Sequence, residues 1–274
     1  MLAAAKRLVR RWVPRLTHPL LDAAFRDEPR DAELDRTYRD VVSGLEPEVA
    51  SDPFVMNRYF EGRRWREVVR HSLDTESLRL LDVGAGNGAI ELAVNATADL
   101  HAFSVEREWN RTASAIHAAV QVPFRRTIAD ARSLPFGDGA FDGILCLETI
   151  EHVREAAQVG RELSRVLRMG GIILVTTPPR WRYALAPDPH FAIPGLALLP
   201  HAWQRSIAHR RGYTEAHHHV EKLFGSISEI ARLFPACRVE EVLSRSRAPK
   251  RWFWDAILLR RIASPAREPA GQLI

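Results

Sequence analysis

Cysteine is scarce in this chain of 274 residues, which contains only Cys146 and Cys237. Two cysteines are too few for a disulfide framework or a cysteine-based zinc cluster, and they suit a reducing compartment. Long apolar runs are lacking as well, because prolines interrupt the longest one, residues 191–200. A membrane-spanning helix needs about 20 apolar residues, so the sequence predicts no transmembrane segment.

Acidic residues are absent from residues 1–16, which hold five basic ones, although the net charge of the whole chain is only +5. The basic residues interrupt the place where the apolar core of a secretory signal would lie. Apolar residues recur there at helical spacing, with the basic ones on the other face. This pattern is typical of a helix on an anionic membrane surface, and equally of a helix docked on its own domain. We expect a cytoplasmic protein, peripheral to the inner face of a membrane if residues 1–16 bind there.

Strands and helices alternate regularly from about residue 65. Apolar residues make up 46 % of the chain and charged residues 27 %, as in ordinary globular proteins. The predicted strands are Leu78–Val83, Leu100–Val105, Phe124–Ala129, Phe141–Leu147 and Ile172–Thr176, and the predicted helices are Arg64–His71, Ala89–Ala96, Glu108–Val120 and Val153–Leu167. Gly170 and Gly171 are expected to end the last helix before its strand. This order predicts a parallel sheet with helices on both faces.

The alternation stops after Pro178 and Pro179. Residues 179–225 have no clear period and are predicted to form an insert after the fifth strand. A helix at Ser226–Phe234 and strands at Cys237–Ser244 and Trp252–Leu259 are expected to close the fold. The predicted architecture is α/β: a Rossmann-like, doubly wound, seven-stranded sheet over residues 65–262, with an N-terminal helical extension (1–64) and a tail (263–274).

The most informative segment runs from Leu80 to Gly88, with the sequence LLDVGAGNG, where a strand meets a helix. Glycines there allow a tight turn and a close approach of a ligand, and the following helix offers free N–H groups. Gly84, Gly86 and Ala89 also fit the G-x-G-x-x-G/A pattern of dinucleotide-binding proteins. Glu106, at the end of the second strand, suits the ribose hydroxyls of either ligand class. The loop alone leaves an NAD(P)-dependent oxidoreductase open.

Two carboxylates, Asp82 and Asp130, distinguish the two ligand classes. Asp82 would repel a pyrophosphate but suits the ammonium group of an amino-acid ligand. Asp82, Glu106 and Asp130 recur every 24 residues, about one strand–helix unit, so all three are predicted to lie at the carboxyl edge of the sheet. No Tyr-x-x-x-Lys or comparable hydride-transfer constellation is recognisable. These features argue against the oxidoreductase.

With these motifs the sequence closely resembles the class I S-adenosylmethionine-dependent methyltransferases, in particular the type 11-like group that methylates small molecules and lipids. The resemblance covers roughly residues 65–178 and the two late strands, and it includes the segments Asp130-Ala131, Leu134-Pro135-Phe136 and Phe141-Asp142. It implies an enzyme that uses S-adenosyl-L-methionine as cofactor. The expected reaction is transfer of the methyl group to a small-molecule or lipid-like acceptor by direct in-line displacement.

The resemblance also implies roles for individual residues. The methionine moiety of the cofactor would be held by Asp82 and by the backbone of Gly84, Ala85, Gly86 and Gly88. Glu106 would accept hydrogen bonds from the ribose hydroxyls. Asp130 and the backbone N–H of Ala131 would contact the adenine, and Leu147 would pack near the reactive centre.

Candidate bases cluster after the fourth strand. His152 is the first choice because the ordinary pKa of histidine lies near working pH, and Glu148 is the second. The alternative is that Glu151 and His152 simply open the following helix. The spacing Glu148-x-x-Glu151-His152 also resembles the metal-binding element of small-RNA 2′-O-methyltransferases and some quinone-biosynthesis O-methyltransferases. A metal-assisted O-methyltransferase is therefore an alternative, with the histidines at 217–219 as further ligands, but no metal is assigned.

By the same resemblance, the stretch after the fifth strand would build the acceptor pocket. Its aromatic and imidazole side chains are candidate walls: Trp181, Tyr183, His190, Phe191, Trp203 and Tyr213. Together with the basic N-terminus, this apolar stretch favours a lipid-like acceptor at a membrane surface. Nucleic acid is a poor candidate partner, because the basic residues are scattered and no platform for base stacking is evident.

Overall fold

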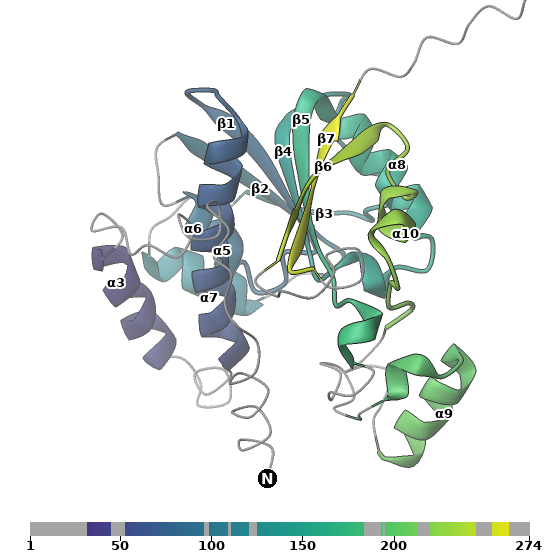
Figure 1. The fold of residues 1–274 in the computed structure, drawn as a ribbon. Coiled ribbons are helices and arrows are strands. Elements are labelled where there is room, and N and C mark those ends of the chain that lie inside the picture. The colour runs from purple at the N-terminus through teal and green to yellow at the C-terminus, as the bar shows by residue number, and fades with distance from the viewer. Residues whose placement is uncertain are drawn as a thin grey trace, which may run out of the picture.

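A seven-stranded mixed sheet forms the centre of the computed structural model, in the order β3-β2-β1-β4-β5-β7-β6 (Figure 1). The structure describes residues 32–44, 53–95, 99–108, 111–120, 125–183, 193, 195–212, 220–244 and 254–262. The strands are β1 (Leu78–Val83), β2 (Leu100–Glu106), β3 (Arg126–Ile128), β4 (Phe141–Leu147), β5 (Leu167–Thr176), β6 (Cys237–Leu243) and β7 (Ala256–Arg261). The predicted fold class is confirmed.

The first five strands are parallel, and β7 is antiparallel to both β5 and β6. The order of the strands reverses between β1 and β4, since the chain moves outward to β2 and β3 and then returns to the other side of β1. Ligands of open α/β sheets bind at the carboxyl ends of the strands next to such a reversal. The topology therefore directs attention to the loops that follow β1, β2, β3 and β4.

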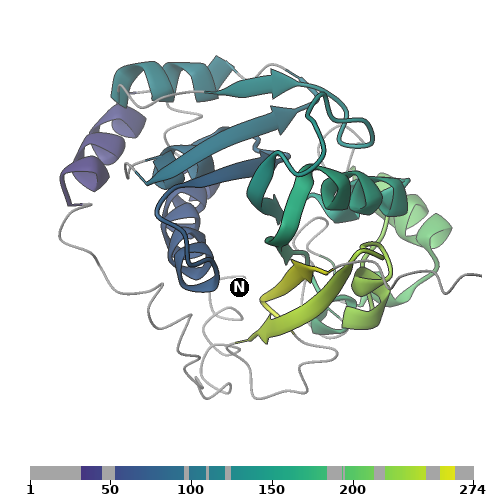
Figure 2. The same ribbon diagram turned by 90° about the horizontal axis from the view of Figure 1, so that it is seen from above.

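Helices cover both faces of the sheet (Figure 2). One face carries α5 (Pro53–Ser72) and α6 (Ala89–Asn95), with α3 (Ala32–Ser43) and α7 (Arg111–Val120) packed beside α6. The other face carries α8 (Ala156–Val166) and α10 (Ile227–Ala231). The short helices η2 (Ile150–His152), η3 (Arg180–Tyr183) and η4 (Leu196–Leu198), and α9 (His201–Arg210), lie in the connections. None of the described helices combines the length and apolar character that a membrane crossing requires.

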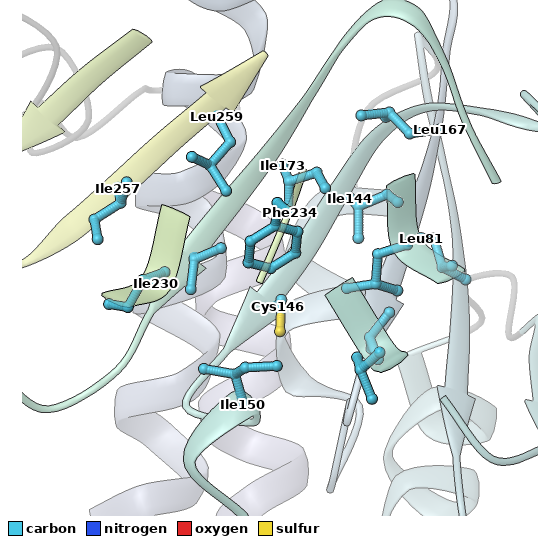
Figure 3. Packing of buried hydrophobic residues seen from close by; sticks show 14 of the residues in the cluster. Leu81, Ile144, Cys146, Ile150, Leu167, Ile173, Ile230, Phe234, Ile257 and Leu259 are labelled. Atoms are coloured by element: carbon cyan, nitrogen blue, oxygen red, sulfur yellow. The ribbon is translucent and has the colours of Figure 1, made fainter. Parts of the chain in front are cut away.

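Successive side chains of a strand point to opposite faces of the sheet, and the core therefore has two layers, one on each face. Side chains of Leu81, Ile144 and Ile173 face α8 and α10, where they meet Ile230 and Phe234 (Figure 3). Leu78 and Leu80 of the same strand β1 face α5 and α6 instead. Because the central strands are covered on both faces, they are almost continuously apolar, as in other parallel sheets.

One local prediction is wrong. Gly170 and Gly171 do not end a helix, because α8 already ends at Val166 and β5 begins at Leu167. They lie in an irregular part of β5, where the pairing with β4 shifts register between Phe141 and Gly143. Gly170 has a φ of 74°, and a Cβ on Gly171 would lie 2.6 Å from the carbonyl oxygen of Asp142. The glycines therefore serve a strand irregularity and a close backbone approach.

Helix α5 is longer than predicted, and it crosses residue 64, where the N-terminal extension was expected to end. The region expected to be an irregular insert contains the helix α9. The predicted amphipathic helix within residues 1–16 and the tail 263–274 lie outside the described residues.

Candidate functional site

The glycine loop after β1 is held in a left-handed backbone conformation. Gly84, Gly86 and Gly88 have φ angles of 75°, 54° and 73°, which residues with a Cβ rarely adopt. A Cβ on Gly84 would lie only 2.5 Å from Oγ1 of Thr149, whereas a Cβ on Gly86 would meet nothing within 4 Å. The loop is thus packed against the end of β4 at Gly84 and open at Gly86.

Side chains from β2, β3 and α7 fix the loop from behind. Arg126 donates to the carbonyl oxygen of Gly86 at 2.9 Å, and a ring nitrogen of His117 lies 2.9 Å from the carbonyl oxygen of Gly88. Glu106 accepts hydrogen bonds from the backbone N–H groups of Gly86, at 2.8 Å, and of Arg107, at 3.0 Å. The loop is therefore preorganised by groups that reach it from three other elements.

Asp82 is a buried carboxylate whose hydrogen-bonding capacity is not fully satisfied by the described residues. Its side chain is 1 % exposed, and Oδ2 has no hydrogen-bond partner among the described residues. Burial raises the pKa of Asp82 to about 7, an effect that the charges of Arg58 and Arg126 partly oppose and that of Glu91 reinforces. Such an unpaired acceptor beside a ligand loop suits a cationic donor from a ligand.

Asp130 has a different environment, although it also follows a strand of the parallel sheet. Both of its oxygens accept hydrogen bonds from the guanidinium of Arg132, at 3.0 and 2.7 Å. Arg132 also donates to Glu155 at 2.9 Å. The paired Arg132 lowers the pKa of Asp130 to about 2. Asp130 is therefore ionised at neutral pH and already engaged by an arginine in this structure.

A cavity of about 500 Å³ lies along the carboxyl ends of these strands. Four residues predicted for the cofactor line it, namely Gly84, Glu106, Asp130 and Ala131, and so do both predicted catalytic residues, His152 and Glu148. Its remaining lining comes from Val83, Val105, Arg107, Ala129, Arg132, Thr149, Val153, Arg154, Glu155 and Glu221. The structure thus brings most of the predicted site residues to one cavity.

Five predicted cofactor residues do not line this cavity. Asp82 lies inside β1, and Ala85, Gly86 and Gly88 lie along the loop beyond Gly84. The side chain of Leu147 is buried in the core layer that faces α5, while its carbonyl oxygen accepts from Arg58 at 2.9 Å.

Glu148 begins the segment after β4 and is the one non-glycine residue with a positive φ, 52°, in the described part of the chain. Its backbone N–H donates to the carbonyl oxygen and to the hydroxyl of Thr176, both at 3.0 Å. Burial raises the pKa of Glu148, although Thr176 and Arg58 act against this rise. A non-glycine residue in this conformation is strained, and such strain often accompanies a functional site.

Glu151 lies one turn further and is fully buried in η2. Burial, together with the neighbouring carboxylate of Glu148, raises the pKa of Glu151 well above its ordinary range. His152, by contrast, is exposed at the cavity wall, and its backbone N–H donates to the carbonyl oxygen of Thr149 at 3.0 Å. The peptide therefore presents one accessible imidazole and two buried carboxyl groups whose pKa values are raised.

The described residues contain no group of three or more histidine, cysteine, aspartate or glutamate side chains arranged to hold a metal ion. The histidines at 217–219 lie outside the described residues. The expected pocket walls Trp181 and Trp203 do not line the cavity and are 44 % and 64 % exposed. Glu221 is the one cavity-lining residue from the expected insert within the described part of the chain.

Several residues of the site were not identified from the sequence. Arg58 and Arg126 supply positive charge near Asp82, Thr149 donates to the carbonyl oxygen of Val83 at 2.9 Å, and Arg132 pairs with Asp130. Arginines are common throughout the chain, and only the fold shows which arginines and which threonine reach the loop. A sequence signal exists for Arg132 alone, because it lies two residues after the predicted Asp130.

Comparison with known proteins identifies the family to which the chain belongs. A family model described as a methyltransferase domain matches residues 81–175. A demethylmenaquinone methyltransferase of Mycobacterium bovis is 30 % identical over 162 residues, which cover 57 % of this chain and 67 % of that protein. A ubiquinone biosynthesis O-methyltransferase of a Caulobacter species is 33 % identical over 114 residues, 40 % of this chain and 45 % of that protein. The chain spans about half the length of several such relatives.

Solved structures support the fold. A Burkholderia thailandensis 1,6-didemethyltoxoflavin-N1-methyltransferase, with bound 1,6-didemethyltoxoflavin and S-adenosylhomocysteine, superposes with a TM-score of 0.52 at 13 % identity, over 92 % of this chain and 95 % of that one. A protein of Pyrococcus horikoshii has a TM-score of 0.56 at 16 % identity, over 80 % of this chain and all of that one.

Proposed function

Because this chain belongs to the family of S-adenosylmethionine-dependent methyltransferases, we propose that it transfers a methyl group from that cofactor to a small-molecule or lipid-like acceptor by direct in-line displacement. The observation that carries the proposal is the arrangement at the carboxyl edge of the sheet. A left-handed glycine loop, the end of β2 and the end of β3 border one cavity, and an unsatisfied buried carboxylate lies directly before the loop.

The chemistry of these groups fits the proposed cofactor. Oδ2 of Asp82, buried without a partner, would accept from the ammonium of the methionine moiety, close to the loop backbone. Glu106 faces the cavity and would accept from the ribose hydroxyls with lone pairs that its two backbone donors leave free. Asp130 and Ala131 would bind the adenine edge. When bound, the cofactor supplies a methyl group on a positively charged sulfur.

We assign the proton-accepting role to His152. Its side chain is exposed to the cavity, whereas Glu148 and Glu151 hold their protons more tightly than ordinary carboxyl groups do. An acceptor hydroxyl would have to lose a proton as its oxygen attacks, and a neutral imidazole takes up protons near pH 7. Glu148, held rigidly by Thr176, would then orient the acceptor. We expect these side chains to align the acceptor and exclude water.

The acceptor class that we propose is a quinone-type aromatic ring. Relatives named for ubiquinone and demethylmenaquinone methylation match this chain over 114 and 148 residues. Such rings carry hydroxyl groups and an apolar body, which suits a cavity with valine and alanine side chains beside glutamate and histidine.

We further propose that residues 1–16 contact the inner face of a membrane and that the enzyme acts in the cytoplasm without a nucleic-acid partner. The cluster of five basic residues with no acidic one supports this contact. Charge reversal at Arg10 and Arg11 should reduce binding to anionic vesicles. Unchanged binding would favour a helix docked on its own domain.

The first experiment is isothermal titration of the protein with S-adenosylmethionine, S-adenosylhomocysteine and NADH in parallel. We expect micromolar binding of the first two and none of NADH. Radiolabelled methyl transfer to hydroxylated quinone precursors then tests the acceptor class. Binding of NADH alone would overturn the cofactor, whereas cofactor binding without transfer to any quinone precursor would overturn only the acceptor.

A further inference from the structure

The helix α9 stands away from the sheet in Figure 1, next to η3 and η4. We name these three elements, residues 180–183 and 195–212, the α9 lobe. Of the six large apolar residues that are most exposed in the described part of the chain, the α9 lobe contributes three, namely Trp181, Leu198 and Trp203. Trp203 is the most exposed of the six, at 64 %. Concentrated apolar exposure of this kind marks an interaction surface.

Hydrogen bonds attach the exposed apolar residues of η3 and η4 to the rest of the domain. The backbone N–H of Arg180 donates to the carbonyl oxygen of Phe224 at 2.8 Å. The guanidinium of Arg182 donates to the carbonyl oxygen of Trp254 at 2.7 Å. Within the lobe, Arg180 donates to the carbonyl oxygen of Leu198 at 3.1 Å. These bonds fix η3 to the domain and η4 to η3, so Trp181 and Leu198 are presented from a held position.

The outward face of α9 combines an indole with positive charge. Among the side chains of α9 that the structure describes, Ala208 is the buried one. At about 100° per residue, Trp203, Ser206 and Arg210 point to the opposite side. Trp203 and Arg210 are seven residues apart, two helical turns, and therefore lie on one line along the helix. An aromatic ring and a guanidinium thus share the solvent side.

Charge in this part of the chain has a single sign. Residues 189–214 contain no aspartate or glutamate, but they contain Arg205, Arg210 and Arg211. All three arginines are exposed. Outside residues 1–16, the rest of the chain mixes acidic and basic residues almost evenly, so this local excess of positive charge is a complement to an anionic surface.

We infer that the α9 lobe is a membrane-contact surface, which places Trp203 and Leu198 in the headgroup region of a bilayer rich in anionic lipid, with Arg210 on the phosphates. A tryptophan and a leucine beside arginines are the side chains that interfacial helices use, because an amphipathic ring and a basic head suit the boundary between water and hydrocarbon. A nucleic acid would satisfy the arginines but not Leu198. The inference does not depend on methyl transfer.

The test is co-sedimentation of the full-length protein with large vesicles of phosphatidylglycerol and phosphatidylcholine in equal parts, with pure phosphatidylcholine vesicles in parallel. We expect binding to the anionic vesicles only, weakened by salt. Trp203→Ala and Arg210→Glu should each lower the bound fraction at least about fivefold. The matched controls are Met169→Ala, since Met169 is 49 % exposed on β5, and Arg161→Glu on the exposed side of α8. Neither control should change binding.

Three results would overturn the inference. The first is no binding of the wild-type protein to anionic vesicles. The second is equal binding by the wild type and both lobe variants, which would assign the contact to another segment such as residues 1–16. The third is preferential, Trp203-dependent capture of a single-stranded RNA oligonucleotide in competition with the vesicles. Binding of S-adenosylmethionine, measured on each variant, shows separately that the fold and the proposed cofactor site are intact.

Discussion

Replacing Asp82 by asparagine should stabilise the ligand-free protein and weaken cofactor binding at the same time. The carboxylate is buried between strands, one oxygen has no partner among the described residues, and its pKa is raised from 3.8 to about 7. Asparagine has nearly the same shape and no charge to bury. The substitution therefore removes a cost of the ligand-free state together with the group that we assign to the ligand's ammonium.

The magnitude follows from proton linkage. Between pH 3.8 and about 7 the folded protein keeps a proton on Asp82 that the unfolded chain has lost, so the free energy of unfolding decreases as pH rises. At 1.36 kcal/mol per pH unit, the loss amounts to roughly 4 kcal/mol and is complete above the folded-state pKa. The Asn variant should lack this loss, and its advantage over the wild type should grow from near zero at pH 4 to a few kcal/mol at pH 8.

Urea denaturation of both proteins at several pH values measures the difference directly. Asp142→Asn is the control, because Asp142 is also buried but accepts a hydrogen bond from the backbone N–H of Arg79 at 2.8 Å and pairs with Arg168. This control should lose about 1–3 kcal/mol. If Asp82→Asn leaves the pH dependence of unfolding unchanged, the description of Asp82 as an uncompensated buried acid is refuted.

Cofactor binding gives the complementary measurement. If the ionised form of Asp82 binds an ammonium, the affinity for S-adenosylmethionine should rise with pH through about 7. Calorimetry at pH 6.5 in two buffers of different ionisation enthalpy should then show proton release on binding. A variant that is more stable and yet binds the cofactor as tightly as the wild type would separate Asp82 from the cofactor site.

Three further predictions concern the rest of the site. Glu106→Gln should weaken cofactor binding at least tenfold, about 1.4 kcal/mol, in isothermal titration, and an unchanged affinity would remove the ribose assignment. His152→Ala should lower kcat while leaving cofactor affinity nearly intact, and normal turnover with a hydroxyl acceptor would exclude it as the base. Arg126→Met should lower the free energy of unfolding by about 1–3 kcal/mol and weaken cofactor binding, because it removes a hydrogen-bond donor to the carbonyl oxygen of Gly86. The control is Arg125→Met, which should affect cofactor binding little, because the guanidinium of Arg125 lies over the ring of Phe103.

Much of the fold could be predicted from short-range patterns. Strands β1 and β4 have the bounds that the sequence suggests, Leu78–Val83 and Phe141–Leu147, because a buried strand is a continuous apolar run that glycine or polar residues end. Strand β5 begins five residues earlier than the predicted Ile172, because its first half is irregular around Gly170 and carries polar residues. Helix α9 was missed because it has few apolar residues and its largest one, Trp203, faces the solvent, so the usual helical period of buried apolar residues is lacking.

The carboxylates of the site were predictable because each lies at or just after the carboxyl end of a strand, and position along the chain fixes position at the sheet edge. Their compensating cations were not, since Arg58 reaches the site from α5 and donates to the carbonyl oxygen of Leu147, 89 residues away. The raised pKa values depend on the balance between these long-range cations and burial. A sequence therefore indicates which acids gather, whereas only the packed structure shows which of them keep their protons.

This balance has a consequence for the proposed chemistry. Burial raises the pKa of both acids, but Asp82 faces two arginines and lies next to an open glycine loop, whereas Glu151 is fully buried and the neighbouring Glu148 adds to the rise of its pKa. Asp82 is therefore the acid that a cationic ligand can ionise near neutral pH. Bulk pH should accordingly affect the cofactor-binding step near pH 7.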